Sequence, residues 1–81
     1  MRNATNMIDP TLVDAAIAHA VSRAARESGG FSVYTDATKA YVRPSAEPSP
    51  AGATLLCIAQ IWDASTVQVR YAGARSEFVR I

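Results

Sequence analysis

The chain is poor in the residues that carry out chemistry. Among its 81 residues there is a single cysteine, Cys57, and a single histidine, His19. One cysteine excludes a disulfide within the chain, which is typical of a protein from a reducing compartment. Because Cys57 stands between Leu56 and Ile58 in an apolar segment, we interpret it as a small buried hydrophobic side chain and not as a nucleophile.

The chain also lacks a strong charge of either sign and a long apolar run. Eight basic and seven acidic residues give a formal net charge of +1, so the composition favours neither a nucleic acid nor a membrane surface. No window approaches the roughly 18 consecutive apolar residues of a membrane-spanning helix. The N-terminus has no apolar stretch of the kind found in a secretory signal. We therefore expect a cytoplasmic protein that does not associate with membranes.

No combination of residues predicts an active site, a metal site or a phosphate loop. Asp14, His19 and Ser22 come nearest to a catalytic triad, but Asp14 and His19 lie about 140° apart around a helix. The adjacent glycines 29 and 30 follow a helical segment, whereas a phosphate loop precedes one. We therefore expect a protein that is not an enzyme and that holds no cofactor and no metal.

One amphipathic helix is predicted at the start of the chain. Asp9 is a good N-cap and Pro10 fits the first helical position. Gly29 and Gly30 are expected to end the helix, because glycine readily adopts the left-handed cap conformation. The apolar stripe of the helix consists of Leu12, Val13, Ala16, Ile17, Ala20, Val21 and Ala24. Much of this stripe is alanine, so the helix can approach a sheet closely.

The rest of the chain has the period of two that is typical of strands. The predicted strands span residues 31–36, 40–44, 54–62, 66–72 and 76–81. The first two predict a hairpin, whereas the long connection 45–53, with its prolines, suggests that the second and third strands are not neighbours. We therefore predict a single α+β domain over residues 1–81, in which an N-terminal helix packs on an antiparallel sheet of about four to five strands, in the order α-β-β-β-β-β. Residues 1–8 are expected to form a loose N-terminal segment.

The segment 54–62 is apolar on both faces, although one helix covers a single face of a sheet. Strict alternation places the smaller side chains toward the helix, namely Leu55, Cys57, Ala59 and Ile61. It leaves the larger ones on the opposite face, namely Leu56, Ile58, Gln60 and Trp62. That second face needs a cover, which a second protomer, another protein or the chain's own segments 1–8 or 45–53 could provide.

Matching the sides of the strands gives a candidate interaction surface of aromatic, aliphatic and arginine side chains. Its members are Tyr34, Tyr41, Arg43, Leu56, Ile58, Trp62, Arg70, Phe78 and Arg80. Aromatic residues and arginine are enriched at the centres of protein interfaces, and a sheet face can pair with itself about a two-fold axis. The same mixture offers the stacking surfaces and positive charges that a single-stranded nucleic acid requires.

These observations predict a small non-enzymatic protein-interaction module that acts as a homodimer. The short chain and the lack of catalytic residues are typical of an accessory or inhibitor protein of a phage or mobile element, with an unidentified protein as partner. The alternative is a single-stranded nucleic-acid-binding protein that uses the aromatic and arginine sheet face. We place this alternative second, because phosphate contacts require an excess of positive charge and the chain has nearly balanced charges. The edge of the last strand, 76–81, offers another route to self-association, since an edge can extend a sheet across a dimer.

Overall fold

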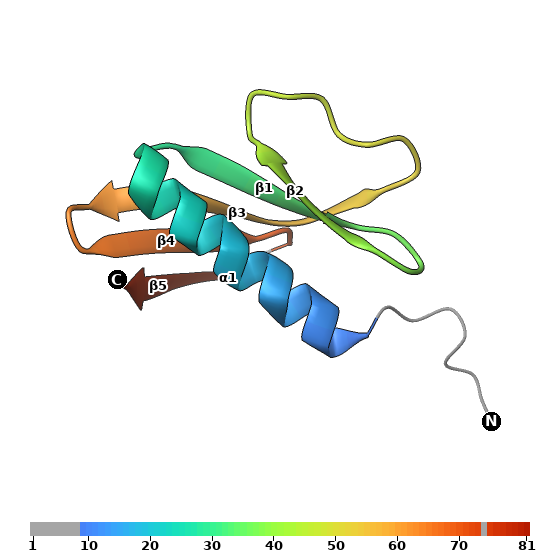
Figure 1. Ribbon diagram of the computed structural model, residues 1–81, viewed down its shortest axis with the longest axis horizontal. Helices are drawn as coiled ribbons and strands as arrows, with labels where there is room; N and C mark the ends of the chain where they lie inside the picture. The colour runs from blue at the N-terminus through green and yellow to red at the C-terminus, as the bar shows by residue number, and fades with distance from the viewer. Residues whose placement is uncertain (1–8, 74) are drawn as a thin grey trace.

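In the computed structural model, which describes residues 9–73 and 75–81, one helix lies across a five-stranded antiparallel sheet (Figure 1). The elements are α1 (Pro10–Glu27), β1 (Gly30–Thr35), β2 (Ala40–Pro44), β3 (Thr54–Asp63), β4 (Thr66–Tyr71) and β5 (Ser76–Arg80). The predicted α+β class and the predicted order of elements are therefore confirmed. The expectation of a loose segment 1–8 lies outside the described residues.

The strands follow the spatial order β2-β1-β3-β4-β5. β1 and β2 form the predicted hairpin, in which Val33 lies opposite Val42. β1 also pairs with β3, so the connection 45–53 leads from one neighbour of β1 to the other. The prediction that the second and third strands are not neighbours is therefore confirmed. β3, β4 and β5 then follow as successive antiparallel neighbours, which leaves β2 and β5 as the edges of the sheet.

The helix begins where the sequence predicts, but its C-terminal cap differs from the prediction. The Asp9 carboxylate accepts a hydrogen bond of 2.9 Å from the amide of Thr11. At the other end Ser28, and not a glycine, takes the left-handed conformation, with φ 52°. The glycine cap was wrong because the sheet begins almost directly after the helix: Gly30 opens β1, and the carbonyl of Gly29 already accepts a hydrogen bond from the amide of Ile61 in β3. The turn must therefore be completed one residue earlier.

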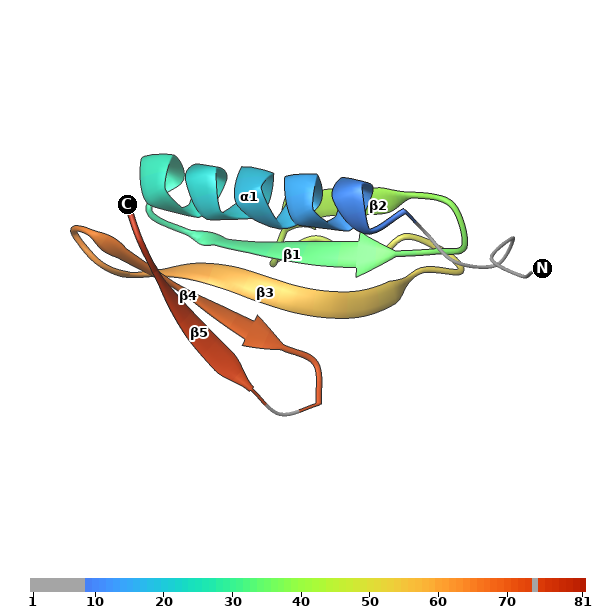
Figure 2. The same cartoon turned by 90° about the horizontal axis from the view of Figure 1, so that it is seen from below.

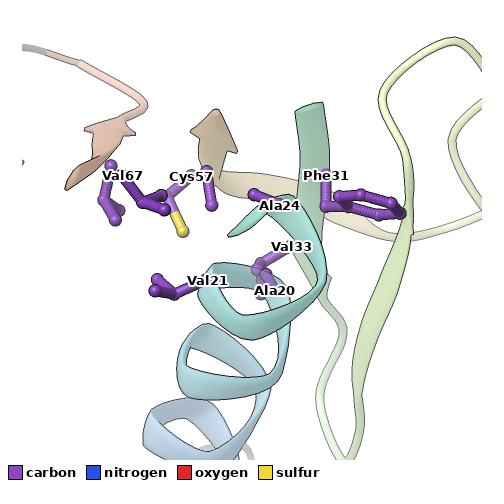
Figure 3. Packing of buried hydrophobic residues seen from close by; sticks show 9 residues of the cluster. Ala20, Val21, Ala24, Phe31, Val33, Cys57 and Val67 are labelled. Carbon is purple, nitrogen blue, oxygen red and sulfur yellow. The ribbon is translucent and has the colours of Figure 1, made fainter. Parts of the chain in front are cut away.

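The core is a thin layer of small side chains between α1 and the sheet (Figure 3). Its buried members are Ala20, Val21, Ala24, Phe31, Val33, Cys57, Ala59, Val67 and Val69. Ala20 and Ala24 have no exposed surface, and neither do Val33 and Cys57 on the sheet side. Because alanine projects so little from the helix, the backbone of α1 can lie close to the sheet, as the alanine-rich stripe predicts.

β3 departs from strict alternation, which changes the predicted faces of its leucines. Where β3 pairs with β1, Val33 lies opposite Cys57 but Tyr34 lies opposite Leu55, so Leu56 is an extra, bulged residue. Directly opposed residues of an antiparallel pair share a face, so Leu55 lies on the face of Tyr34, away from the core, and Leu56 packs against the core. The predicted places of Leu55 and Leu56 were therefore wrong, because alternation cannot be continued through a bulge.

Candidate interaction surface

The face of the sheet opposite α1, called here the far face, gathers most of the predicted surface residues. Across the strands, Arg43 lies opposite Ser32, Ser32 opposite Ile58, and Ile58 opposite Arg70. Because opposed residues project to the same side, these four side chains form one row across the far face. The prediction that Arg43 and Arg70 share a face with Ile58 therefore agrees with the register.

Neighbouring rows place further predicted residues on the same face, since residues two apart in a strand share a side. Tyr41 lies opposite Tyr34 in the row on one side. On the other side Gln68 lies opposite Phe78, and Arg80 lies opposite Thr66. Leu56 is the one predicted member that the structure removes from this surface, because it packs against the core cluster.

Trp62 and Phe78 form an exposed aromatic pair at one end of the far face. A second bulge, between the pairs Ile61–Val67 and Asp63–Thr66, makes Trp62 an extra residue of β3. Its ring meets that of Phe78 edge to face, with centroids 5.1 Å apart and planes at 71°. The two residues are 60% and 56% exposed, respectively, although aromatic side chains of this size are usually well covered. This pair is the most accessible apolar feature of the far face.

The β1 part of the far face, by contrast, is covered within the chain itself. Ser32 and Tyr34 keep only 2% and 8% of their surface. The hydroxyl of Ser32 is 3.1 Å from that of Ser45, which follows β2. Arg70, Trp62 and Phe78 are exposed. The surface that could receive a partner is therefore smaller than the sequence indicated, and it lies toward β3, β4 and β5.

Tyr41 is held by a contact in the β1–β2 turn. Its hydroxyl donates a hydrogen bond of 2.5 Å to the Asp36 carboxylate, which also accepts from the amides of Thr38 and Lys39, both at 2.8 Å. The bond from Tyr41, followed by those from the two amides, lowers the pKa of Asp36 to about 2. The same bond raises the pKa of Tyr41. This bond therefore ties Tyr41 to the β1–β2 turn, and the hydroxyl of Tyr41 already has a hydrogen-bond partner within the chain.

Cys57 is enclosed in the core, as predicted. It has no exposed surface, and burial, followed by the negative charge of Glu77, raises its pKa to about 11. The thiol is therefore protonated at neutral pH, in contrast to the thiolates that act as nucleophiles. The sulfur lies between the sheet and the helix (Figure 3), where it fills space.

The three residues of α1 that come nearest to a catalytic triad do not line one common pocket. Asp14 and Ser22 line a groove between α1 and the β4–β5 side, whereas His19 lines another hollow beside β2. Within residues 9–73 and 75–81, no three His, Cys, Asp or Glu side chains are grouped so as to hold a metal ion. In the same residues, no helix has the length and hydropathy needed to cross a membrane.

The groove beside α1 is an apolar feature that the sequence prediction missed. β4 and β5 bend away from the helix (Figure 2), and the open groove between these two strands and α1 has a volume of about 520 Å³. Its apolar lining consists of Ile17, Ala18, Val21, Ala25, Tyr71, Val79 and Ile81. The number of predicted strands could have indicated this groove. A sheet of five strands at about 4.8 Å spacing is wider than one helix of about 10 Å, so the helix leaves part of the sheet uncovered.

The far face carries arginine side chains that take part in none of the ion pairs of the described residues. In the described part of the chain the ion pairs are Arg23–Glu27 and Arg75–Glu77. The arginines of the far face, which are Arg43, Arg70 and Arg80, take part in neither pair. Their guanidinium groups are therefore available to a partner that carries carboxylates or phosphates.

Comparisons with protein-family models, with curated proteins and with solved structures found no significant match to this chain. Any proposal about its function therefore depends on the chain's own surface.

Proposed function

We propose that the protein is a small, cytoplasmic, non-enzymatic protein-interaction module that acts as a homodimer. The observation that supports this most is the exposed edge-to-face pair of Trp62 and Phe78, with centroids 5.1 Å apart. Fully burying a side chain of this type contributes about 1.5–3 kcal/mol, so covering both rings is a substantial driving force. Aromatic residues are also the side chains that dominate the binding energy of protein interfaces.

The surroundings of the pair favour a protein as its partner. Gln60 and Gln68 face each other beside the rings, and Arg80 lies on the same face two residues from Phe78, so the patch has a polar border. An 81-residue chain buries a limited share of its surface on folding, and association is a common way to increase that share. An accessory or inhibitor protein of a phage or mobile element would act in this manner, by occupying a surface of a larger assembly.

Measurement of the mass in solution tests the homodimer. Sedimentation equilibrium is expected to give about twice the chain mass of 8.6 kDa. Trp62→Glu places a charge among the rings and is expected to weaken association at least tenfold, which corresponds to about 1.4 kcal/mol. Leu12→Glu is the matched control, because Leu12 is also a large exposed side chain, at 48%, but lies on α1. A protein that remains at the mass of one chain at all concentrations would refute the proposal.

Single-stranded nucleic-acid binding is the second candidate, and the register is the observation that favours it. Arg43 and Arg70 lie in one row of the same face that carries Trp62 and Phe78, so positive charge and stacking surfaces occur together. Anisotropy of a labelled oligonucleotide at two salt concentrations tests this, since phosphate contacts weaken as salt rises. Arg70→Ala should then weaken binding and reduce its salt dependence. Absence of salt-sensitive binding would remove this candidate.

A further inference from the structure

The outer side of β5 presents a regular row of backbone groups. The amide of Ile81 donates to the carbonyl of Ser65, and the amide of Tyr71 donates to the carbonyl of Arg75, both at 2.8 Å. Residues 75 and 81 thus direct their backbone groups toward the β4 side. Because these directions alternate along a strand, residues 77 and 79 do the same. The residues that direct both N–H and C=O away from β4 are Ser76, Phe78 and Arg80.

We propose that β5 pairs antiparallel with β5 of a second copy, with Phe78 on the two-fold axis. This rests on the proposed homodimer and names the segment that joins its two chains. In this register Phe78 exchanges both backbone hydrogen bonds with the second Phe78, and Ser76 exchanges both with Arg80 of the second copy. Every outward-facing donor and acceptor of β5 then has a partner. A register shifted by two residues leaves an end of each strand unpaired.

The side chains of this register agree with the backbone. The two Phe78 residues form a hydrogen-bonded pair, whose Cα atoms lie about 5.5 Å apart, so their rings meet on the far face. Each ring already contacts its own Trp62, and the axis therefore joins two exposed pairs into one aromatic row. β5 has the sequence SEFVR and lacks the proline and lysine that commonly prevent edge pairing. An unrelated strand could use the same backbone groups, but a second copy also supplies a second Trp62–Phe78 pair.

Proline substitutions test the backbone pairing. Ser76→Pro and Arg80→Pro each remove an outward N–H while leaving the donors that face β4 in place. Each is expected to raise the dimer dissociation constant at least tenfold in sedimentation, with the far-UV circular dichroism spectrum unchanged. Ser76→Ala and Arg80→Ala are the matched controls, because they alter the side chain and keep the N–H. Equal dissociation of the proline and alanine variants would overturn the backbone pairing.

Disulfide trapping tests the register. A residue on the two-fold axis meets its own copy, so Phe78→Cys should give a covalent dimer on mild oxidation, at a Cα separation that a disulfide accepts. Glu77→Cys is the control, since Glu77 would lie opposite Val79 of the second copy and more than about 7 Å from its own counterpart. Buried Cys57 gives little background. Equal cross-linking of Glu77→Cys would overturn the register.

The two proposals fail in different ways. A wild-type protein with the mass of one chain contradicts the homodimer, and the β5 pairing with it. A dimer that Trp62→Glu dissociates, but that tolerates Ser76→Pro and does not trap Phe78→Cys, keeps the homodimer and overturns the β5 pairing. In that case the two copies meet through the far face itself.

Discussion

Ala20→Leu tests whether small side chains on α1 are what allow the helix to lie close to the sheet. Ala20 has 0% exposed surface, and Val33 on the sheet side is equally buried. If space were available, the larger side chain would add about 2 kcal/mol of stability, at about 0.8 kcal/mol per methylene. Because the layer between helix and sheet is filled, we expect overpacking to cost about 1–3 kcal/mol instead. A domain of this size has a stability of about 4–12 kcal/mol, so the melting temperature should fall by about 5–20 °C.

Thermal and urea unfolding followed by far-UV circular dichroism measures this cost. Trp62 is 60% exposed, so its fluorescence would be a weak reporter. Ala15→Leu is the matched control: Ala15 is exposed on the same helix, so the substitution changes helix propensity equally and is expected to stay within about 0.5 kcal/mol of wild type. Measurement at two protein concentrations separates folding from association. If Ala20→Leu is as stable as Ala15→Leu, the close packing inferred for α1 is incorrect.

The remaining predictions concern Cys57, the Asp36–Tyr41 bond and the groove beside α1. Cys57 should react with a thiol reagent only on unfolding, because burial raises its pKa to about 11; rapid reaction of the native protein would contradict its enclosure. Tyr41→Phe should raise the pKa of Asp36 from about 2 toward 3.8, as carboxyl carbon NMR can measure, and an unchanged titration would mean that the bond does not form. Folding lowers this pKa, so the contribution of Asp36 to stability is present at neutral pH and is lost as the pH falls through 3.8 toward about 2. In Tyr41→Phe the pKa of Asp36 lies closer to 3.8, so the loss of stability on acidification should be smaller. Ile17→Asp removes apolar contacts worth about 2 kcal/mol or more and adds an unpaired charge beside the core, so its melting temperature should fall by at least about 10 °C; a near-wild-type value would show that Ile17 contributes little.

Local patterns predicted the elements well because each depends on neighbouring residues. The Asp9–Pro10 start, the alanine stripe and the change of period after the helix gave the helix and all five described strands, and every predicted strand end coincides with the observed one or differs from it by one residue. The left-handed cap was assigned to the wrong residue, since Ser28 takes that conformation. Its position depends on where the sheet begins, and local preference does not contain that information.

The faces on which the candidate residues lie were predicted in part. Alternation correctly grouped Arg43, Ile58 and Arg70, because it holds wherever the ladder is regular. It misplaced Leu56, and Leu55 with it, because a bulge adds a residue to one strand without any clear mark in the sequence. The groove beside α1 was missed altogether, as its opening depends on how far β4 and β5 bend from the helix.

Short-range patterns were sufficient to predict the helix, the strands, their order along the chain and the enclosure of Cys57, because hydrophobic period and turn residues act over short distances. The spatial strand order β2-β1-β3-β4-β5, the bulges of β3 and the burial of Ser32 and Tyr34 became visible only in the three-dimensional arrangement. That arrangement also shows that Trp62 meets Phe78 on the accessible part of the far face. These features arise from register between strands that are distant in sequence, and register is set by the packing of the whole sheet.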